Sequence, residues 1–360
     1  MIQGVSKHTN EQKYRAIQMD SSSSLKDFSM DRRKYYKKYL LNESVEEKEN
    51  LAITMGKVVE VFLLEPHLFD EKFYMSACAS GPTGLMGDFV EALYRANKEA
   101  TDENGNITKS FEEMSKEAYI ASGFKIKYEA VISKFVGSDA EIFYNEIRQV
   151  RAKNLTVVTM QDVTNAEKIV EELKTNSITA NIVNLTRSHK FDVFNQFQIE
   201  GYTVDGHLFK SMIDKIIVNH QEKTISIYDL KCTYSIDGFY VDYYLYRRSY
   251  FQAYLYYKAI ESLTLNVNDE WYGYEVFPPI FMVCDSINYY SPLLYVLTMK
   301  DLDDAYNGFS YNGKHYSGTK ETIENLKFAL TNNIWNISKE NYLLNGRVPL
   351  VKSFGNLINL

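Results

Sequence analysis

The feature that most constrains this chain is a predicted β-hairpin, SMIDKIIVNHQEKTISIYDLKCT, at residues 211–233. If Val218 and Ile225 close the hairpin, counting four residues along each strand places Asp214 directly opposite Asp229. Like charges in this position destabilise a sheet, so burying them requires either a protonated acid or a compensating cation. Mg²⁺ is a suitable cation, because it is held by one or two carboxylates together with waters and phosphate oxygens. A slip of one residue in the register would remove this opposition.

Lys231 belongs to the same group of side chains. Because successive side chains of a strand point to opposite faces, Asp229 and Lys231 share one face. A lysine beside two carboxylates and a metal can orient a water or neutralise charge that develops on a phosphate. The alternative is a solvated surface hairpin with scattered charges, but both strands are too apolar on both faces for a solvated edge. The residues responsible are Ile213, Ile216, Ile217, Ile225 and Ile227.

An acidic residue, Glu60, lies inside a strongly apolar predicted helix, ITMGKVVEVFLLEPHLF, at residues 53–69. Pro66 fits the end of this helix, since the residue before a proline resists helical torsions. Gly56 lies one turn before Glu60 on the same face and is expected to leave the carboxylate open to approach. A carboxylate flanked by valines and a phenylalanine is therefore a candidate functional group.

A second predicted helix, roughly residues 243–263, follows the hairpin. Within RRSYFQAYLYYKAI, Arg248, Gln252 and Tyr256 are spaced four apart and form one polar stripe. A guanidinium, an amide and a phenol in line can bind phosphate oxygens or hold a water near Lys231. The alternative is an amphipathic helix with a solvated face.

The remaining pattern predicts an α/β fold in which helices cover a mixed sheet. Residues 1–20 are polar and are expected to be loose. Residues 76–190 favour helices and are interpreted as a helical insertion between the two parts of the core, 21–75 and 191–360. The first predicted strands are 191–200, 202–210, 211–218 and 224–231, with breaks at Gly201 and Gly206.

The core begins with a predicted serine-capped helix at Ser21–Ser24. Its segment RRKYYKK, which starts with Arg32 and Arg33, interleaves cations with aromatic residues, as a contact with a DNA backbone does. The alternative is a solvated helix face. Its expected buried anchors are Leu25, Phe28, Tyr36 and Leu40.

Charge and cysteine content exclude some classes of protein. The net charge of −7 argues against a protein that coats nucleic acid non-specifically, although it allows a local basic cleft. The 3 cysteines are far apart and form no CxxC pair, which excludes the usual zinc and iron–sulfur spacings and suits a reducing cytoplasm. The N-terminus does not look like a signal peptide, and no run of about 18 apolar residues predicts a membrane span.

Taken in order, these motifs resemble the RecB-like branch of the PD-(D/E)xK nucleases, and most closely the RecE-type exonucleases of phages and prophages. The matching segments are SSSSLKDF, MGKVVEVFLLEPHLFD, GHLFKSMID, IYDLKCT and YFQAYLYY, between residues 21 and 257. A D-x-K triplet alone is common by chance, whereas the ordered set is far more specific. The resemblance implies a restriction-endonuclease-like fold, with residues 76–190 inserted into the nuclease core.

The resemblance also implies roles for individual residues. Asp214 and Asp229 would bind Mg²⁺, for which Mn²⁺ is expected to substitute, and the backbone carbonyl of Leu230 would assist. Lys231 would position the attacking water. Glu60 stands where the family usually has a histidine, and we interpret it as a third carboxylate on the metal. The expected phosphate contacts are Gln252, Tyr256, Arg248 and Lys210, with solvation as the alternative for Lys210.

The function implied by the resemblance is resection of double-stranded DNA ends for recombination in a bacterial cytoplasm, by a phage-encoded or host enzyme. A single-strand annealing protein and a homo-oligomer are the implied partners. One alternative is an endonuclease or structure-specific nuclease with the same site. The other is a catalytically inactive DNA-binding protein that keeps the fold.

Overall fold

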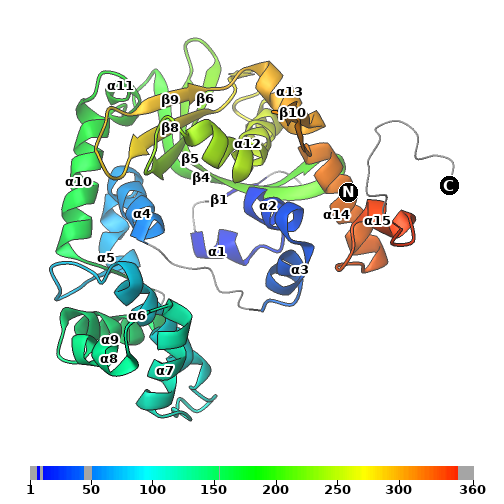
Figure 1. Cartoon of the computed structure of the whole chain (residues 1–360). Helices are drawn as coiled ribbons and strands as arrows, with labels where there is room; N and C mark the ends of the chain where they lie inside the picture. The colour runs from blue at the N-terminus through cyan, green and yellow to red at the C-terminus, as the bar shows by residue number, and fades with distance from the viewer. Residues whose placement is uncertain (1–5, 9–10, 44–50, 154, 348–360) are drawn as a thin grey trace.

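The computed structural model describes residues 6–8, 11–43, 51–153 and 155–347, and a mixed seven-stranded sheet lies at its centre (Figure 1). The strand order is β1–β4–β5–β6–β8–β9, and β7 also pairs with β6. β4, β5 and β6 are antiparallel neighbours, whereas β7 and β8 run parallel to β6. The strands are β1 (Ser6–His8), β4 (Phe191–Val204), β5 (His207–Asn219), β6 (Thr224–Thr233), β7 (Glu275–Val276), β8 (Ile280–Asp285) and β9 (Leu293–Val296). The predicted α/β class, a mixed sheet flanked by helices, is confirmed.

Helices cover both faces of the sheet, and four further helices form a unit of their own. The main ones are α1 (Glu11–Ala16), α2 (Ser22–Met30), α3 (Arg32–Tyr35), α4 (Leu51–Leu64), α6 (Gly84–Glu99), α7 (Phe111–Ser122), α8 (Tyr128–Phe135), α9 (Asp139–Val150), α10 (Met160–Thr175), α12 (Ser249–Thr264), α13 (Met299–Asn307), α14 (Thr319–Asn332) and α15 (Lys339–Leu343). Among the described residues, no helix is long and apolar enough to cross a membrane.

The β5–β6 hairpin has the predicted register. Val218 pairs with Ile225 and Ile216 with Ile227, and the ladder continues as far as the pair formed by Lys215 and Tyr228. The loop is shorter than expected, because Asn219 and Thr224 also pair. Alternating apolar residues fix this register, since a slip of one residue would turn them away from the core.

The expected strand break at Gly201 is wrong. β4 and β5 are two long strands joined by a tight turn at Asp205 and Gly206. Gly201 lies inside β4 at φ +82°, where the register with β5 shifts. A glycine at positive φ accommodates such a bulge without ending the strand.

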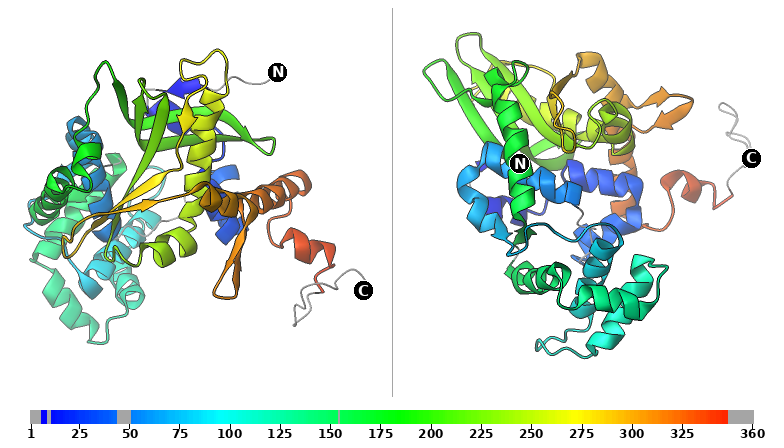
Figure 2. Two further views of the ribbon diagram at one scale, coloured as in Figure 1. Left: turned by 90° about the horizontal axis from the view of Figure 1, so that it is seen from above. Right: turned by 60° about the vertical axis from the view of Figure 1, so that its left-hand side comes forward.

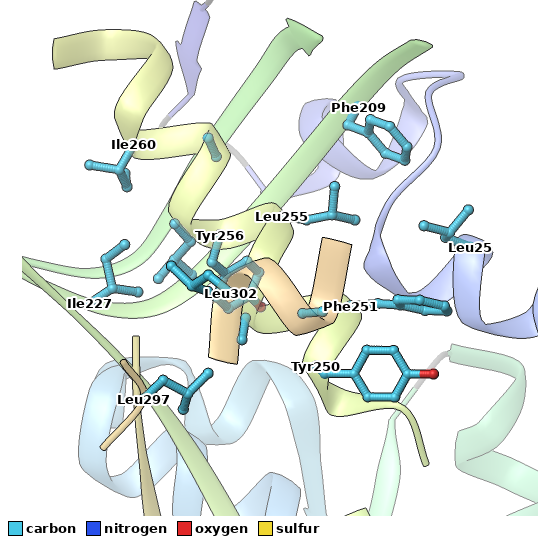
Figure 3. Packing of buried hydrophobic residues seen from close by; sticks show 14 of the residues in the cluster. Leu25, Phe209, Ile227, Tyr250, Phe251, Leu255, Tyr256, Ile260, Leu297 and Leu302 are labelled. Atoms are coloured by element: carbon cyan, nitrogen blue, oxygen red, sulfur yellow. The ribbon is translucent and has the colours of Figure 1, made fainter. Parts of the chain in front are cut away.

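One face of the sheet packs against α12, α2 and the C-terminal helices in the larger hydrophobic core. Figure 3 shows Leu255, Ile260 and Ile227 in this core, with Leu25 of α2 on the side of α12 that carries Phe251. Burying each leucine or isoleucine contributes roughly 1.5–3 kcal/mol. This packing fixes α12 over the strands that carry the predicted site.

The opposite face packs against α4 and α10, which form a second core with Leu230 and Met282. Gly56 of α4 faces β6 closely, since a Cβ placed on it would lie 3.8 Å from Cβ of Cys232. Gly56 therefore faces β6, and a methyl group there would make an ordinary van der Waals contact with Cys232.

Residues 84–150 form a separate helical unit. Helices α6 to α9 surround their own hydrophobic core and lie at one end of the molecule, away from the sheet (Figures 1 and 2). Two short parallel strands, β2 (Phe73–Met75) and β3 (Thr156–Val158), lie where the chain enters and leaves this unit. The α10 helix belongs to the core beside α4, so the packing boundary does not coincide with residue 190.

The expectation that residues 1–20 are loose is wrong for the residues that the structure describes there. β1 extends the sheet along β4, and the Lys7 ammonium lies 3.9 Å from the centroid of the Trp271 ring. Tyr14 of α1 is buried. These contacts join the segment to the sheet, and its polar sequence gave no sign of them.

The serine-capped start of α2 is confirmed, because Ser21 and Ser24 form a capping box. The helix ends earlier than expected, since Asp31 accepts hydrogen bonds from backbone N–H groups of α3 and starts a new helix. This break changes the phase of the following residues. Leu25, Phe28 and Tyr35 are buried, whereas Tyr36 is half-buried and Leu40 is exposed.

Candidate active site

Asp214 lies where β5 parts from both of its neighbours. The β5–β6 ladder ends before Asp214 and Asp229, and the β4–β5 ladder skips Asp214 and Gln196. Gln196 has a φ of +49°, which turns its backbone out of the strand geometry. The carboxylate Oδ2 of Asp214 instead accepts the N–H of Leu230 at 2.8 Å. A side-chain bond thus replaces the ladder and leaves a gap between the strands.

Asp229 is held by two partners on the α12 face of β6. The Lys231 ammonium forms an ion pair with its carboxylate, and Gln252 Nε2 donates to Oδ1 at 2.7 Å. The Asp229 side chain is 1% exposed and that of Lys231 is 20% exposed, so the pair is shielded but open on the lysine side. The predicted grouping of Asp229 and Lys231 on one face is therefore present.

Gln252 and Tyr256 support this pair from α12. Gln252 Nε2 also donates to the Tyr256 hydroxyl at 2.8 Å, and that hydroxyl donates to the carbonyl of Met212 at 2.6 Å. Tyr256 is buried. Its hydroxyl thus anchors the amide that holds Asp229, although both residues also border the cavity described below.

Glu60 reaches the same cluster from α4. Its Oε1 accepts a hydrogen bond from Gln196 Nε2 at 2.8 Å, so the residue that interrupts β4 also fixes this carboxylate. Burial raises the pKa of Glu60, the Lys231 charge opposes the rise, and the Asp229 charge adds to it. Glu60 is therefore within electrostatic range of Asp229 and Lys231.

The carboxylates compete for one ammonium group. Burial raises the pKa of Asp214 well above its usual range, and the charges of Asp229 and Glu60 raise it further. Burial also raises the pKa of Asp229, against the effect of Lys231. Burial lowers the pKa of Lys231, but the carboxylates of Asp229 and Asp214 outweigh it and leave the pKa raised. The cluster lacks positive charge.

Carboxylates such as Asp214, Asp229 and Glu60 suit a hard divalent cation, but in this arrangement they do not form a preformed metal site. Three carboxylates against one ammonium leave two negative charges when all are ionised, which a dication would neutralise, and carboxylate oxygens are ligands that Mg²⁺ prefers. Among the described residues, however, no three Asp, Glu, His or Cys side chains lie where they could hold one ion together. The Lys231 ammonium takes the position against Asp229.

A cavity of about 1160 Å³ opens beside Asp214 and extends over α2 and the residues that precede it. Asp214, Gln252 and Tyr256 border it on one side. Six cationic side chains also line it, namely Arg15, Lys26, Lys34, Lys38, Lys210 and Arg247. Three aspartates, Asp20, Asp27 and Asp214, line the same cavity, so cations are in excess there on a chain of net charge −7.

Of the four predicted phosphate-binding cations, only Lys210 lines this cavity. Lys210 lines the cavity, but its ammonium donates to the backbone carbonyls of Tyr14 and Ile17 at 3.0 and 2.8 Å, which ties α1 to β5. Arg248 precedes α12 at φ +56°, because the expected single helix is divided into a π-helical segment (Tyr240–Tyr246) and α12. Arg248, Arg32 and Arg33 do not line the cavity.

Sequence reasoning missed Gln196, Lys26 and Arg247. Gln196 reads as an ordinary polar strand residue, and its positive φ has no sequence signal because glutamine rarely adopts it. Lys26 lies inside the recognised motif SSSSLKDF, and Arg247 is the neighbour of the arginine that was chosen. The sequence does not show which of the cations near the motif lack an acidic partner, so it could not single out Lys26 and Arg247.

No protein-family model and no curated protein sequence matches this chain. A comparison with solved structures finds a protein from Eubacterium rectale that is named as a candidate exonuclease. The two chains superpose with a TM-score of 0.45 and 13% sequence identity, over 95% of this chain and 94% of the other. A likeness of this degree carries no conclusion about activity, so the proposal below rests on the geometry of the site.

Proposed function

We propose that this chain is a metal-dependent deoxyribonuclease with Asp214, Asp229 and Lys231 at the centre of its active site. The observation that carries the proposal is their meeting point, in the gap between β5 and β6 beside a cavity lined with cations. Phosphodiester hydrolysis needs a place for a polyanion next to groups that can hold a metal and a water. The cavity and the carboxylate cluster lie side by side.

Mg²⁺ is the proposed cofactor, with Mn²⁺ as a substitute. Asp214, Asp229 and Glu60, assisted by the carbonyl of Leu230, would hold it. When bound, the ion would lower the pKa of a water and polarise the phosphate. Lys231, which already forms an ion pair with Asp229, would then lie beside the ion.

The protein groups have separate tasks in this scheme. Lys231, whose side chain is 20% exposed, would donate a hydrogen bond to the attacking water or to the phosphate oxygen that gains charge. Gln252 keeps one oxygen of Asp229 fixed, and Tyr256 keeps Gln252 fixed. The Gln196 amide orients Glu60.

The finer proposal is an exonuclease that resects double-stranded DNA ends for recombination, and it rests on the sequence resemblance. A single-strand annealing protein and further copies of this chain are the proposed partners, in a bacterial cytoplasm. Linear and covalently closed circular duplexes separate the exonuclease from an endonuclease with the same site. An exonuclease leaves the closed circle intact.

The direct test is digestion of an end-labelled duplex with Mg²⁺ by wild type and Asp229→Ala. We expect the wild type to release label only with the metal and the variant to release none. Glu222→Ala is the matched control, because Glu222 is an exposed acid in the hairpin loop. Cleavage by Asp229→Ala at the wild-type rate would place the active site elsewhere.

The second candidate is a DNA-binding protein that keeps this fold without catalysis. The observation that favours it is the ion pair of Lys231 with Asp229 and the lack of a ready ligand set among the described residues. This candidate predicts duplex binding without hydrolysis at any Mg²⁺ or Mn²⁺ concentration.

A further inference from the structure

The cations of the cavity differ in whether they already have partners. Lys34 and Lys38 both form ion pairs with Asp27, at 2.9 and 3.3 Å. The Arg15 guanidinium binds Glu11, with Nε 2.7 Å from the carboxylate. The Lys210 ammonium is held by backbone carbonyls. Four of the six cations are therefore part of the protein's own contacts.

Lys26 and Arg247 are the exceptions. Within the described chain, neither side chain has a hydrogen bond or ion pair, and Arg247 only stacks on the Tyr243 ring, 4.2 Å from its centroid. Lys26 is half-buried on α2, whereas Arg247 is exposed just before α12. An ammonium group taken partly out of water without a partner is unfavourable, so Lys26 lies in a position that suits an anion.

The surroundings of Lys26 strengthen this conclusion. Burial lowers the pKa of its ammonium and the Asp27 carboxylate opposes the fall, but the charges of Lys231, Lys34 and Arg247 add to it. Asp27 is already held by Lys34, Lys38 and Tyr39. Lys26 is thus within electrostatic range of both the candidate catalytic lysine and Arg247, and cations dominate its surroundings.

We propose that Lys26 and Arg247 form a phosphate-binding site on the wall of the cavity, which holds a phosphodiester group of a DNA strand beside the one at Asp214 and Lys231. This inference rests on the proposed function. A phosphate between α2 and the start of α12 balances charges that the protein leaves unpaired, just as a dication does for the carboxylates. The unpaired cations Lys26 and Arg247 and the carboxylate Asp214 all line the same cavity. A chain of alternating phosphates and sugars can occupy both places at once.

The test is binding of a 3′-labelled single-stranded oligonucleotide, dT6, followed by fluorescence anisotropy in EDTA so that no hydrolysis occurs. We expect Lys26→Gln to weaken binding about tenfold and to reduce the slope of log affinity against log salt by about 0.7, the value for one phosphate contact on a single strand. Lys26→Arg should keep most of the affinity. Lys37→Gln is the control, since Lys37 is exposed nearby but does not line the cavity.

The outcomes separate the two proposals. If Lys26→Gln binds dT6 with unchanged affinity and salt slope while Asp229→Ala still abolishes digestion, the phosphate site is refuted and the nuclease stands. If the wild type neither binds dT6 nor digests duplex, the proposed function itself fails. Lys26→Gln should also unfold at the wild-type temperature or higher, because its ammonium has no partner to lose. A marked fall would mean a structural role and would overturn the inference. Competition by inorganic phosphate at equal concentration would show a site for free anions instead.

Discussion

Asp214→Asn should stabilise the metal-free protein while it abolishes activity. Asparagine keeps an oxygen that can accept the Leu230 N–H, so the local hydrogen bond survives. The substitution removes the charge of Asp214, which is repelled by Asp229 and Glu60 and attracted by Lys231. One uncompensated repulsion therefore disappears. Replacing a functional residue by a neutral one often raises the stability of the folded protein.

The magnitude follows from Coulomb's law. Two like charges about 5–8 Å apart repel each other by about 2–3 kcal/mol at an effective dielectric constant of about 20. Partial protonation of the wild-type acid lowers the gain, because its pKa is already raised. We expect the free energy of unfolding to rise by about 1–3 kcal/mol at pH 7.5 in EDTA.

Urea denaturation followed by tryptophan fluorescence measures this change as a higher midpoint with an unchanged slope. The difference in free energy of unfolding between the variant and wild type should shrink as the pH falls from 7.5 to 5. The raised pKa of the buried wild-type carboxyl means that it takes up a proton in the folded state before the unfolded chain does, and the penalty then disappears. Asp237→Asn, at an exposed aspartate, is the control. A variant that is less stable than wild type, or a difference independent of pH, would refute the mutual repulsion.

Three further predictions concern stability and positioning. Lys210→Met should lower the free energy of unfolding by about 1–2 kcal/mol in urea, because backbone carbonyls at the end of α1 lose their donor. Gly56→Ala should be neutral or stabilise by up to about 1 kcal/mol, whereas Gly318→Ala should reduce the yield of folded protein, since its Cβ would lie 2.2 Å from the carbonyl of Tyr306. Tyr256→Phe should cost about 1–2 kcal/mol and should lower turnover more than it changes dT6 affinity, because the lost hydroxyl holds Gln252.

The centre of the candidate site could be predicted because core packing determines it. Ile216, Val218, Ile225 and Ile227 must face the same core, and this fixes the register that brings Asp214 towards residues 229 and 231. A strand pattern with one buried face permits few alternatives. The sequence therefore carried enough information for the hairpin and its charged residues.

The N-terminal segment could not be predicted in the same way. β1 has three residues, and its strand geometry depends on pairing with β4 far away in the sequence. The contact of Lys7 with the Trp271 ring and the burial of Tyr14 are likewise long-range. Local sequence preferences say little about elements that only tertiary contacts stabilise.

Backbone geometry and charge pairing are two features that the sequence did not show. Gln196 and Arg248 adopt positive φ values that their residue types disfavour; the β4–β5 ladder skips a pair at Gln196, and Arg248 lies between the π-helical segment and α12. The partners of Lys210 and Lys26 depend on three-dimensional neighbours. A lysine that binds backbone carbonyls at a helix end cannot be told from a phosphate-binding lysine by sequence alone.

β5 and β6 are joined by their ladder only between residues 215–219 and 224–228, and they separate beyond it. Asp214 belongs to the half formed with β4, whereas Asp229 and Lys231 belong to the half that β8 holds from Tyr228 to Thr233. The bond from Leu230 to the Asp214 carboxylate crosses this seam. A ligand that joins the carboxylates would therefore add a second link between β5 and β6 beyond the end of their ladder.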